Sequence, residues 1–280
     1  MAPSTSALLT QWNWEPSVLI GLLLISVAYW YAVGPLRQRR NLGPPPTTLQ
    51  ISCFVLSVAV ASFALLSPLD AISDTYLFSA HMVQHLLLAS LWPLLVLLSL
   101  PEWLVRPLLR RAWIAGFLSF FTFPVVALLM FNIDIDVWHL PVLYDETLSN
   151  EQVHILEHLS FMAFGLLVWW PALSPIPEQR LAYPMRVLYL FANAMFMMVL
   201  GIVFTFSPTP FYAPYVHAPR LWGISALADQ QFGGLIMWYP GNLPYAIALV
   251  VAFYRWFEGE NPSPSQISGT QSPTIGPPLP

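Results

Sequence analysis

Residues 76–98, YLFSAHMVQHLLLASLWPLLVLL, form an apolar run without a single Asp, Glu, Lys or Arg. About 20 apolar residues are enough to cross a bilayer as a helix, and a helix satisfies its own backbone hydrogen bonds in lipid. The run therefore predicts a transmembrane helix. Its two histidines, His81 and His85, lie four residues apart near its start. Because an ionisable side chain at membrane depth is costly, this pair calls for a functional explanation.

Six further runs share this length and composition. Together the seven predict transmembrane helices at residues 17–33, 48–66, 76–98, 113–131, 152–170, 184–206 and 231–256. Only 9% of the 280 residues are charged, against about 25% in a soluble domain. We therefore expect an all-α membrane protein with seven transmembrane helices, and bends at the prolines of the third, fourth and seventh.

The chain divides into three parts. Residues 1–16 are expected to lie outside the membrane, residues 17–257 to form the seven-helix domain, and residues 258–280 to form a disordered tail rich in Pro and Ser. The first apolar run begins late and has no basic residues before it. It is therefore expected to be a retained span and not a cleaved signal peptide.

The arginines predict the orientation. The chain has no lysine, and nine of its ten arginines flank the same ends of the predicted spans; they are Arg37, Arg39, Arg40, Arg106, Arg110, Arg111, Arg180, Arg186 and Arg255. Only Arg220 lies on the other side. Since basic loops stay in the cytoplasm, we expect the N-terminus outside and the C-terminus in the cytoplasm. All six histidines then lie toward the outer face.

A second histidine pair, His154 and His158, begins the fifth predicted span on that same side. Side chains four residues apart share one helix face, so each pair can present two imidazoles to one point. If spans three and five are neighbours, the two pairs can hold one metal ion or share two. Imidazole suits copper, zinc, nickel or iron. The sequence therefore predicts a metal site near the extracytoplasmic face, with His81, His85, His154 and His158 as ligands.

Five other residues are candidates for ligating the metal or orienting its ligands. Glu157, between the histidines of span five, can accept the second N–H of an imidazole, and Asp229 opens span seven on the same side. Met82 and Met237 offer thioethers, which suit cuprous copper. His139 follows a tryptophan in a predicted outer loop.

Other kinds of site are excluded. Cys53 is the only cysteine, so neither a disulfide framework nor a CxxC motif exists. It is predicted near the cytoplasmic side, almost a membrane thickness from the histidines. His217 lies in a long outer loop and is not expected to be a ligand. The chain has no P-loop and no GxSxG elbow, and its arginines form no track for nucleic acid.

Four segments together resemble a known family. They are SAHMVQHLLL (79–88), WHLPVLYD (138–145), VHILEHLSF (153–161) and LADQQFGGLIMW (227–238). In this order and with these separations, the chain resembles the CtaG-type cytochrome c oxidase assembly proteins of the caa-type oxidase branch, over about residues 60–257. The family motifs map without departure onto His81, Met82, Gln84, His85, Trp138, His139, His154, Glu157, His158, Asp229, Gln230, Gly234, Met237 and Trp238.

The resemblance implies a seven-span protein of the bacterial inner membrane that is not an enzyme and helps to build the terminal oxidase. It implies copper as the metal, because the oxidase needs copper, and cytochrome c oxidase subunits as partners. Soluble periplasmic copper chaperones and the lipid bilayer are further expected partners.

The residues leave three other functions open. A histidine-box membrane di-metal oxidase or hydroxylase suits VHILEH, although such enzymes carry more histidines, on the cytoplasmic side. A b-type haem protein needs only one axial histidine on each of two spans, which leaves the second histidine of each pair unexplained. An inward copper transporter needs ligands deeper in the helices, where only scattered methionines occur. A copper-handling assembly factor is therefore the leading hypothesis.

Overall fold

The computed structural model describes residues 3–260, and all the regular elements within them are helical. In chain order these are α1 (Thr5–Leu8), α2 (Pro16–Tyr31), η1 (Ala32–Leu36), α3 (Arg37–Arg40), α4 (Thr48–Leu66), α5 (Pro68–Thr75), α6 (Phe78–Leu86), η2 (Leu87–Leu91), α7 (Trp92–Ser99), α8 (Glu102–Val105), η3 (Arg106–Arg110), α9 (Ala112–Phe121), α10 (Pro124–Trp138), α11 (Pro141–Ser149), α12 (Glu151–Leu173), η4 (Pro177–Gln179), α13 (Tyr183–Phe206), α14 (Ala213–His217) and α15 (Ala226–Glu260). The all-α prediction is confirmed.

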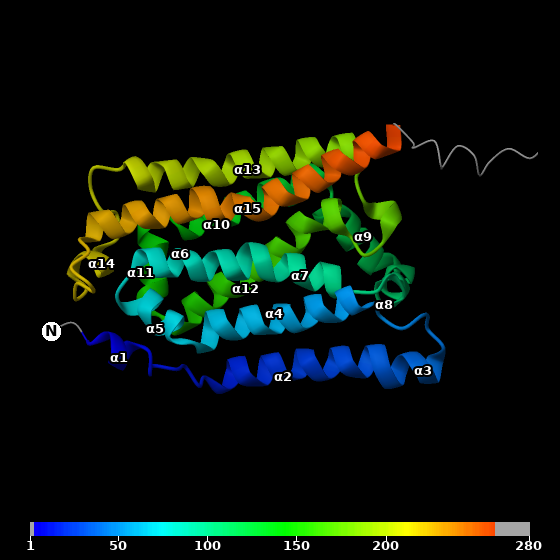
Figure 1. The fold of residues 1–280 in the computed structure, drawn as a ribbon, viewed down its shortest axis with the longest axis horizontal. Coiled ribbons are helices and arrows are strands. Elements are labelled where there is room, and N and C mark those ends of the chain that lie inside the picture. The colour runs from blue at the N-terminus through cyan, green and yellow to red at the C-terminus, as the bar shows by residue number, and fades with distance from the viewer. Residues whose placement is uncertain (1–2, 261–280) are drawn as a thin grey trace, which may run out of the picture.

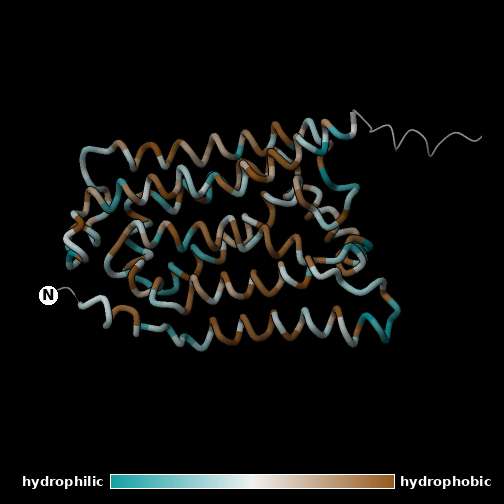
Figure 2. The backbone as a smooth tube through the Cα atoms, in the orientation of Figure 1, coloured by the Kyte–Doolittle hydropathy of each residue, from teal (hydrophilic) through white to brown (hydrophobic). Residues whose placement is uncertain are grey.

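Six helical stretches are long and apolar enough to cross a membrane. They run along the long axis of the molecule (Figure 1), with apolar residues along their length and hydrophilic ones gathered toward the ends (Figure 2). Large apolar side chains face outward, as expected of helices in contact with lipid. The chain is thus a multi-pass membrane protein, with spans Pro16–Arg40, Thr48–Leu66, Phe78–Ser99, Glu151–Leu173, Tyr183–Phe206 and Ala226–Gly259.

The fourth expected span is broken at Pro124, where a bend was predicted. In place of one helix over residues 113–131, α9 ends at Phe121 and α10 begins at Pro124, and the two are bent by 68°. Proline lacks the N–H that a continuing helix needs, and it forces the preceding residue into an extended conformation; Phe123 has φ −59° and ψ 128°. Counted as one broken span, the pair brings the total to seven.

The last helix is longer than expected. α15 continues through Pro240 and Pro244 to Glu260, so residues 258–260 are helical although the sequence predicted a disordered tail from residue 258. The rest of that predicted tail lies outside the described residues.

Close packing of α13 on α15 depends on two glycines. A Cβ added to Gly234 would lie 2.6 Å from the Thr205 backbone nitrogen and 2.7 Å from the Gly201 carbonyl oxygen. One added to Gly201 would lie 3.0 Å from the Gly234 carbonyl oxygen. Small residues let membrane helices approach closely where lipid removes the hydrophobic driving force. Gly234 therefore sets how near α15 lies to α13.

The two ends of the bundle differ in charge. The helices α3, α8 and α9 and the C-terminal end of α15 lie at one end, while α1, α5, α11 and α14 lie at the other (Figure 1). The nine arginines predicted to share one side belong to or flank elements at the first end, and Arg220 belongs to the second. The asymmetry seen in the sequence is therefore also an asymmetry in space.

Replacing Gly234 with Ala should destabilise the bundle by about 1–3 kcal/mol, because the new methyl group meets backbone atoms that cannot turn away. Unfolding in mixed micelles, followed by circular dichroism, measures the change. Gly21→Ala is the matched control, since a Cβ at Gly21 in α2 meets nothing within 4 Å. Equal stability of the two variants would show that the glycine contact does not limit the packing of α13 on α15.

Candidate metal centre

Five histidines and one glutamate gather at the end of the bundle that holds α5, α11 and α14. Two of the imidazoles come from α6, two more and the glutamate from α12, and the fifth histidine ends α10. Within the pairs, the ring centroids lie 4.1 Å apart on α6 and 4.2 Å apart on α12. Between the pairs, they lie 5.4 Å apart for His81 and His154 and 5.6 Å apart for His85 and His158. Spans three and five are therefore neighbours at the depth of the histidines.

The tightest group of potential ligands contains three histidines and the glutamate. His81, His154, Glu157 and His158 each offer one ligand atom, and these four atoms lie within 4.8 Å of one another. A tetrahedral site with metal–nitrogen bonds of 2.0–2.1 Å separates its ligand atoms by about 3.3 Å, so modest side-chain movement closes the group around an ion. His85 stands beside it, with Nε2 3.7 Å from Glu157 Oε1. The sequence analysis predicted His85 as one of the four ligands and Glu157 only as a further candidate for ligating the metal or orienting its ligands.

Eight buried polar atoms of this cluster have no hydrogen-bond partner among the described residues. They are His81 Nε2, His85 Nδ1, His85 Nε2, His139 Nε2, His154 Nε2, Glu157 Oε1, Glu157 Oε2 and His158 Nε2. A buried polar atom left unsatisfied costs about 1–3 kcal/mol, and elsewhere such atoms are scattered singly. The chemistry of this donor set fits a bound cation, which would satisfy several of these atoms together.

Hydrogen bonds determine which nitrogen of His81 is free. The Tyr215 hydroxyl donates to the Ser73 carbonyl at 2.6 Å and lies 2.9 Å from His81 Nδ1. Because its proton is used on that carbonyl, the hydroxyl oxygen accepts the Nδ1–H of the imidazole. The lone pair of His81 then lies on Nε2, a buried atom without a hydrogen-bond partner among the described residues. Such orientation of an imidazole through its second nitrogen is usual for metal ligands.

His139 is in the same tautomer. It was expected in an outer loop, but it is the C-terminal cap of α10 and is 5% exposed. Its Nδ1 lies 2.7 Å from the Ile135 carbonyl oxygen, to which it donates, and this leaves Nε2 as the acceptor. Its ring centroid is 5.6 Å from that of His85. His139 is therefore a fifth imidazole of the cluster, on the side of His85.

The short helix α5 packs against α6 and brings Asp74 next to His154 of α12. Asp74 Oδ2 lies 3.6 Å from His154 Nδ1. Gln84 holds α5 in place, because its amide donates to Asp70 Oδ1 and to the Ala64 carbonyl, both at 2.9 Å, and accepts from the Ser73 hydroxyl. Burial, with the neighbouring Asp74 charge, raises the pKa of Asp70 to about 6, and burial raises that of Asp74 to about 7. Both carboxyls therefore change charge near neutral pH.

Asp229, predicted as a ligand or supporting residue, accepts hydrogen bonds from the start of α6. Its carboxylate accepts from the Phe78 and Ser79 backbone N–H groups at 2.7 and 3.1 Å and from the Ser79 hydroxyl. These are the N–H groups that open α6, whose own N-terminal residue offers no side-chain cap. Asp229 thus caps α6 from α15 and fixes the turn that carries His81.

The two candidate methionines, Met82 and Met237, are buried. Met82 and Met237 pack in an apolar cluster with Phe78, Tyr144, Phe204, Tyr212 and Tyr215. This cluster lies directly beside the site, since the ring centroids of Tyr144 and His81 are 5.2 Å apart. Both methionines therefore pack the wall next to the histidines.

Other residues of the four motifs hold helices together. Trp138 Nε1 donates to Ser160 Oγ at 2.8 Å and to Asp134 Oδ1, which joins α10 to α12 next to His139. Gln230 accepts the Phe211 N–H and donates to the Thr209 carbonyl, which holds the chain before α14. The Trp238 Cβ lies against Gly201 on α13. His217 is exposed, and Cys53 is buried in α4.

Sequence reasoning missed Tyr215 and Asp74, which contact two of the histidines. Tyr215 is 134 residues from His81, in a segment predicted as loop. Asp74 lies before span three in the sequence but contacts His154 on α12, 80 residues away. Both contacts join separate elements, so no periodic pattern along one helix indicates them.

A family profile described as "Cytochrome c oxidase caa3 assembly factor" matches residues 27–259. Uncharacterized proteins of Mycobacterium bovis and Mycobacterium tuberculosis are each 27% identical over 273 residues, which cover 91% of this chain and 40% of theirs. One of Mycobacterium leprae is 25% identical over 271 residues, with the same coverage. The chain thus spans about two fifths of the length of these relatives. No solved structure matches it significantly.

Tyr215→Phe should weaken metal binding by about 10- to 100-fold, because it removes the acceptor that holds His81 in the tautomer with Nε2 free. Titration of the metal-free protein with Cu²⁺, followed by calorimetry, measures the affinity. Tyr144→Phe is the control from the same aromatic cluster, since its hydroxyl makes only a 3.4 Å contact, with Tyr215. Equal affinity of Tyr215→Phe and the unmodified protein would remove Tyr215 from the site.

Proposed function

The chain belongs to the cytochrome c oxidase caa3 assembly factor family, and we propose that it holds copper at the buried histidine cluster and delivers it to the oxidase during assembly. The eight unpartnered polar atoms of the cluster carry this proposal. A protein that only scaffolds the oxidase has no need to bury five imidazoles and a carboxylate without partners. In a protein that binds a cation there, coordination to the metal offsets the free-energy cost of burying these imidazoles and the carboxylate.

The donor set admits copper. Imidazole nitrogens and one carboxylate oxygen suit cupric copper, zinc and iron, whereas the thioethers that favour cuprous copper lie in the neighbouring apolar cluster. Copper is proposed because the family serves an oxidase that requires it. The ligands proposed to contact it are His81, His154, Glu157 and His158, with His85 and His139 on the adjacent side.

Delivery requires a ligand that can be exchanged with a partner. His154 is the imidazole of the cluster that is not fully buried, with its side chain 13% exposed. Asp74, 3.6 Å away, is 33% exposed. We propose that copper enters and leaves past this pair, through which an oxidase subunit or a soluble copper chaperone reaches the site. The remaining imidazoles hold the ion while one ligand changes.

The orientation of the protein in the membrane is also a proposal. The nine arginines at one end of the bundle favour that end as the cytoplasmic one. The cluster then lies near the extracytoplasmic face of the bacterial inner membrane, on the side from which copper is available. His81 and His154 each lie three residues after the first residue of their helix, which places them roughly 5 Å below the helix ends.

The double variant His81→Ala/His158→Ala should lose most of the copper that the unmodified protein retains after loading and desalting, because it removes two of the four closest ligands. Elemental analysis of the purified protein measures this loss. In membranes that contain only the variant, the assembled oxidase should carry less copper than in membranes with the unmodified protein.

His217→Ala is the matched control, since this exposed histidine on α14 lies outside the cluster. Helix content measured by circular dichroism separates loss of metal from loss of fold. If the double variant and the control retain equal amounts of copper, the proposed site is wrong. Bound iron with oxygen-dependent oxidation of a lipid would favour a di-metal enzyme.

Single cysteines placed at the two ends in a Cys53→Ser background should differ in their labelling of intact cells. Trp222→Cys, at the end with the histidine cluster, should react with a membrane-impermeant maleimide, because that end is proposed to face outward. Gln38→Cys, among the arginines of α3, should react only after the membrane is opened. Both positions are exposed. The reverse pattern would invert the proposed orientation.

A further inference from the structure

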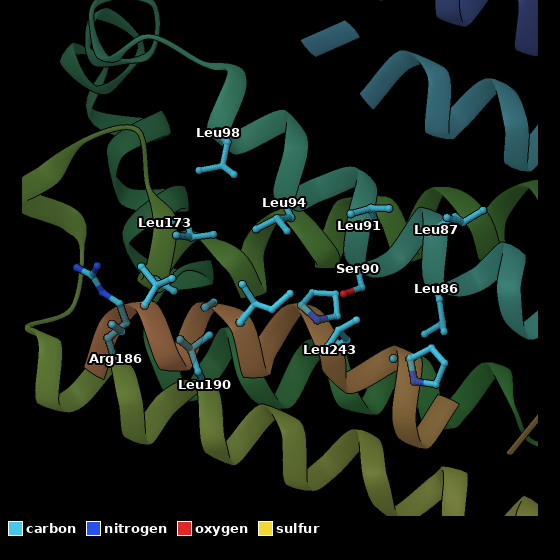
Figure 3. Close-up of a pocket in the computed structure, with 18 of the residues that line it drawn as sticks. Leu86, Leu87, Ser90, Leu91, Leu94, Leu98, Leu173, Arg186, Leu190 and Leu243 are labelled. Carbon is cyan, nitrogen blue, oxygen red and sulfur yellow. The ribbon is translucent and has the colours of Figure 1, made fainter. Parts of the chain in front are cut away.

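A long apolar groove lies on the opposite side of α6 from the histidines. Its walls are α6, η2 and α7 on one side and the second half of α15 on the other, and it encloses about 850 Å³. Figure 3 shows leucines along its length, from Leu86 to Leu98, with Ser90 as the polar side chain near its middle. Leu243 and Val251 on its rim are 57% and 54% exposed, so the groove opens on the lipid-facing side of the molecule.

One end of this groove is basic. Arg180, Arg186 and Arg255 line it there, and Figure 3 shows Arg186 beyond Leu173 and Leu190 at the end of the row of leucines. Arg255 lies 3.7 Å from Glu258. Within residues 3–260, Arg180 and Arg186 form no ion pair with a carboxylate. Their side chains donate to the Ser174 and Leu181 carbonyls, and the Arg186 guanidinium also lies over the Tyr183 ring, 4.7 Å from its centroid. The Arg186 Nε is buried and unpartnered.

We propose that this groove binds an anionic phospholipid, with an acyl chain along the leucines and the headgroup phosphate at Arg180 and Arg186. The charge at the groove end is complementary to a phosphate, and guanidinium groups bind phosphate by paired, charge-assisted hydrogen bonds. The groove parallels the membrane-spanning helices, so its long axis has the direction of an acyl chain in the leaflet that contains the arginines.

Selectivity for this lipid comes from its headgroup. A bilayer is as apolar as the leucines of the groove, so burying an acyl chain there gains little from the hydrophobic effect. The arginines supply what distinguishes one lipid from another. A basic residue near anionic lipid contributes about fivefold in affinity, so the two unpaired arginines together contribute more than tenfold. Removing them should abolish the preference and leave weak, unselective lipid contact.

The test uses the whole protein in mild detergent, incubated with vesicles of equal parts dioleoyl phosphatidylglycerol and dioleoyl phosphatidylcholine. Native mass spectrometry counts the lipids that stay bound. The unmodified protein should retain phosphatidylglycerol in preference to phosphatidylcholine. Arg180→Gln/Arg186→Gln should lower the ratio of the two by tenfold or more. Leu243→Trp, which fills the groove from its exposed rim, should lower the retention of both lipids.

The matched control is Arg39→Gln/Arg40→Gln, which removes two exposed arginines from the same end of the bundle but outside the groove. It should keep the preference for phosphatidylglycerol. An equal loss in both double variants would show general surface attraction and overturn the proposal, as would equal retention of the two lipids by the unmodified protein. A second protein chain displaced by Leu243→Trp would identify a helix, and not a lipid, as the occupant. None of these outcomes depends on copper.

Discussion

Burial of five imidazoles and a carboxylate at one end of the bundle is the constraint on which the rest of the structure depends. Each of these groups loses its water on burial, and eight of their polar atoms find no replacement within the described chain. An uncompensated group of this kind normally opposes folding. The helices that carry it are therefore held by contacts that do not involve the histidines themselves.

Three sets of hydrogen bonds provide those contacts. Asp229 on α15 caps the start of α6. Gln84 on α6 donates to α4 and to α5, and Trp138 joins α10 to α12. Each acts within one turn of a histidine, so each limits how far an imidazole can move. Close contact of α15 with Phe78 and Met82 of α6 at Gly233 brings Asp229 within reach of the start of α6. The positions of the ligand atoms thus depend on helix packing throughout the bundle.

The two ends of the bundle carry different side chains. All six histidines and most of the carboxylates lie at one end and nine of the ten arginines at the other, with the apolar lengths of the helices between them. At the arginine end, Glu102, Glu178 and Glu258 pair with arginines. The two proposed binding sites follow this division. A cation is proposed at the end with unpartnered nitrogen and oxygen atoms, and an anionic headgroup at the end with unpaired guanidinium groups. The helix α6 contributes to both sites, with His81 and His85 at the cluster and Val83 and Leu86 in the groove.

The amino-acid sequence by itself determined the helical class, the approximate spans, the family and the two histidine pairs. Hydrophobic length and the spacing of four residues are local properties, and a single helix expresses them without a partner. The break at Pro124 was foreseen as a bend, but its 68° angle depends on how α9 packs. Only the tertiary structure decided that Glu157, and not His85, belongs to the tightest group of potential ligands, that His139 joins the cluster, and that Asp229 caps α6. It also decided that Tyr215 orients His81. These relations join residues from 54 positions apart, for His85 and His139, to 151 apart, for Phe78 and Asp229. They depend on the relative rotation and depth of packed helices, which no periodicity along one helix encodes.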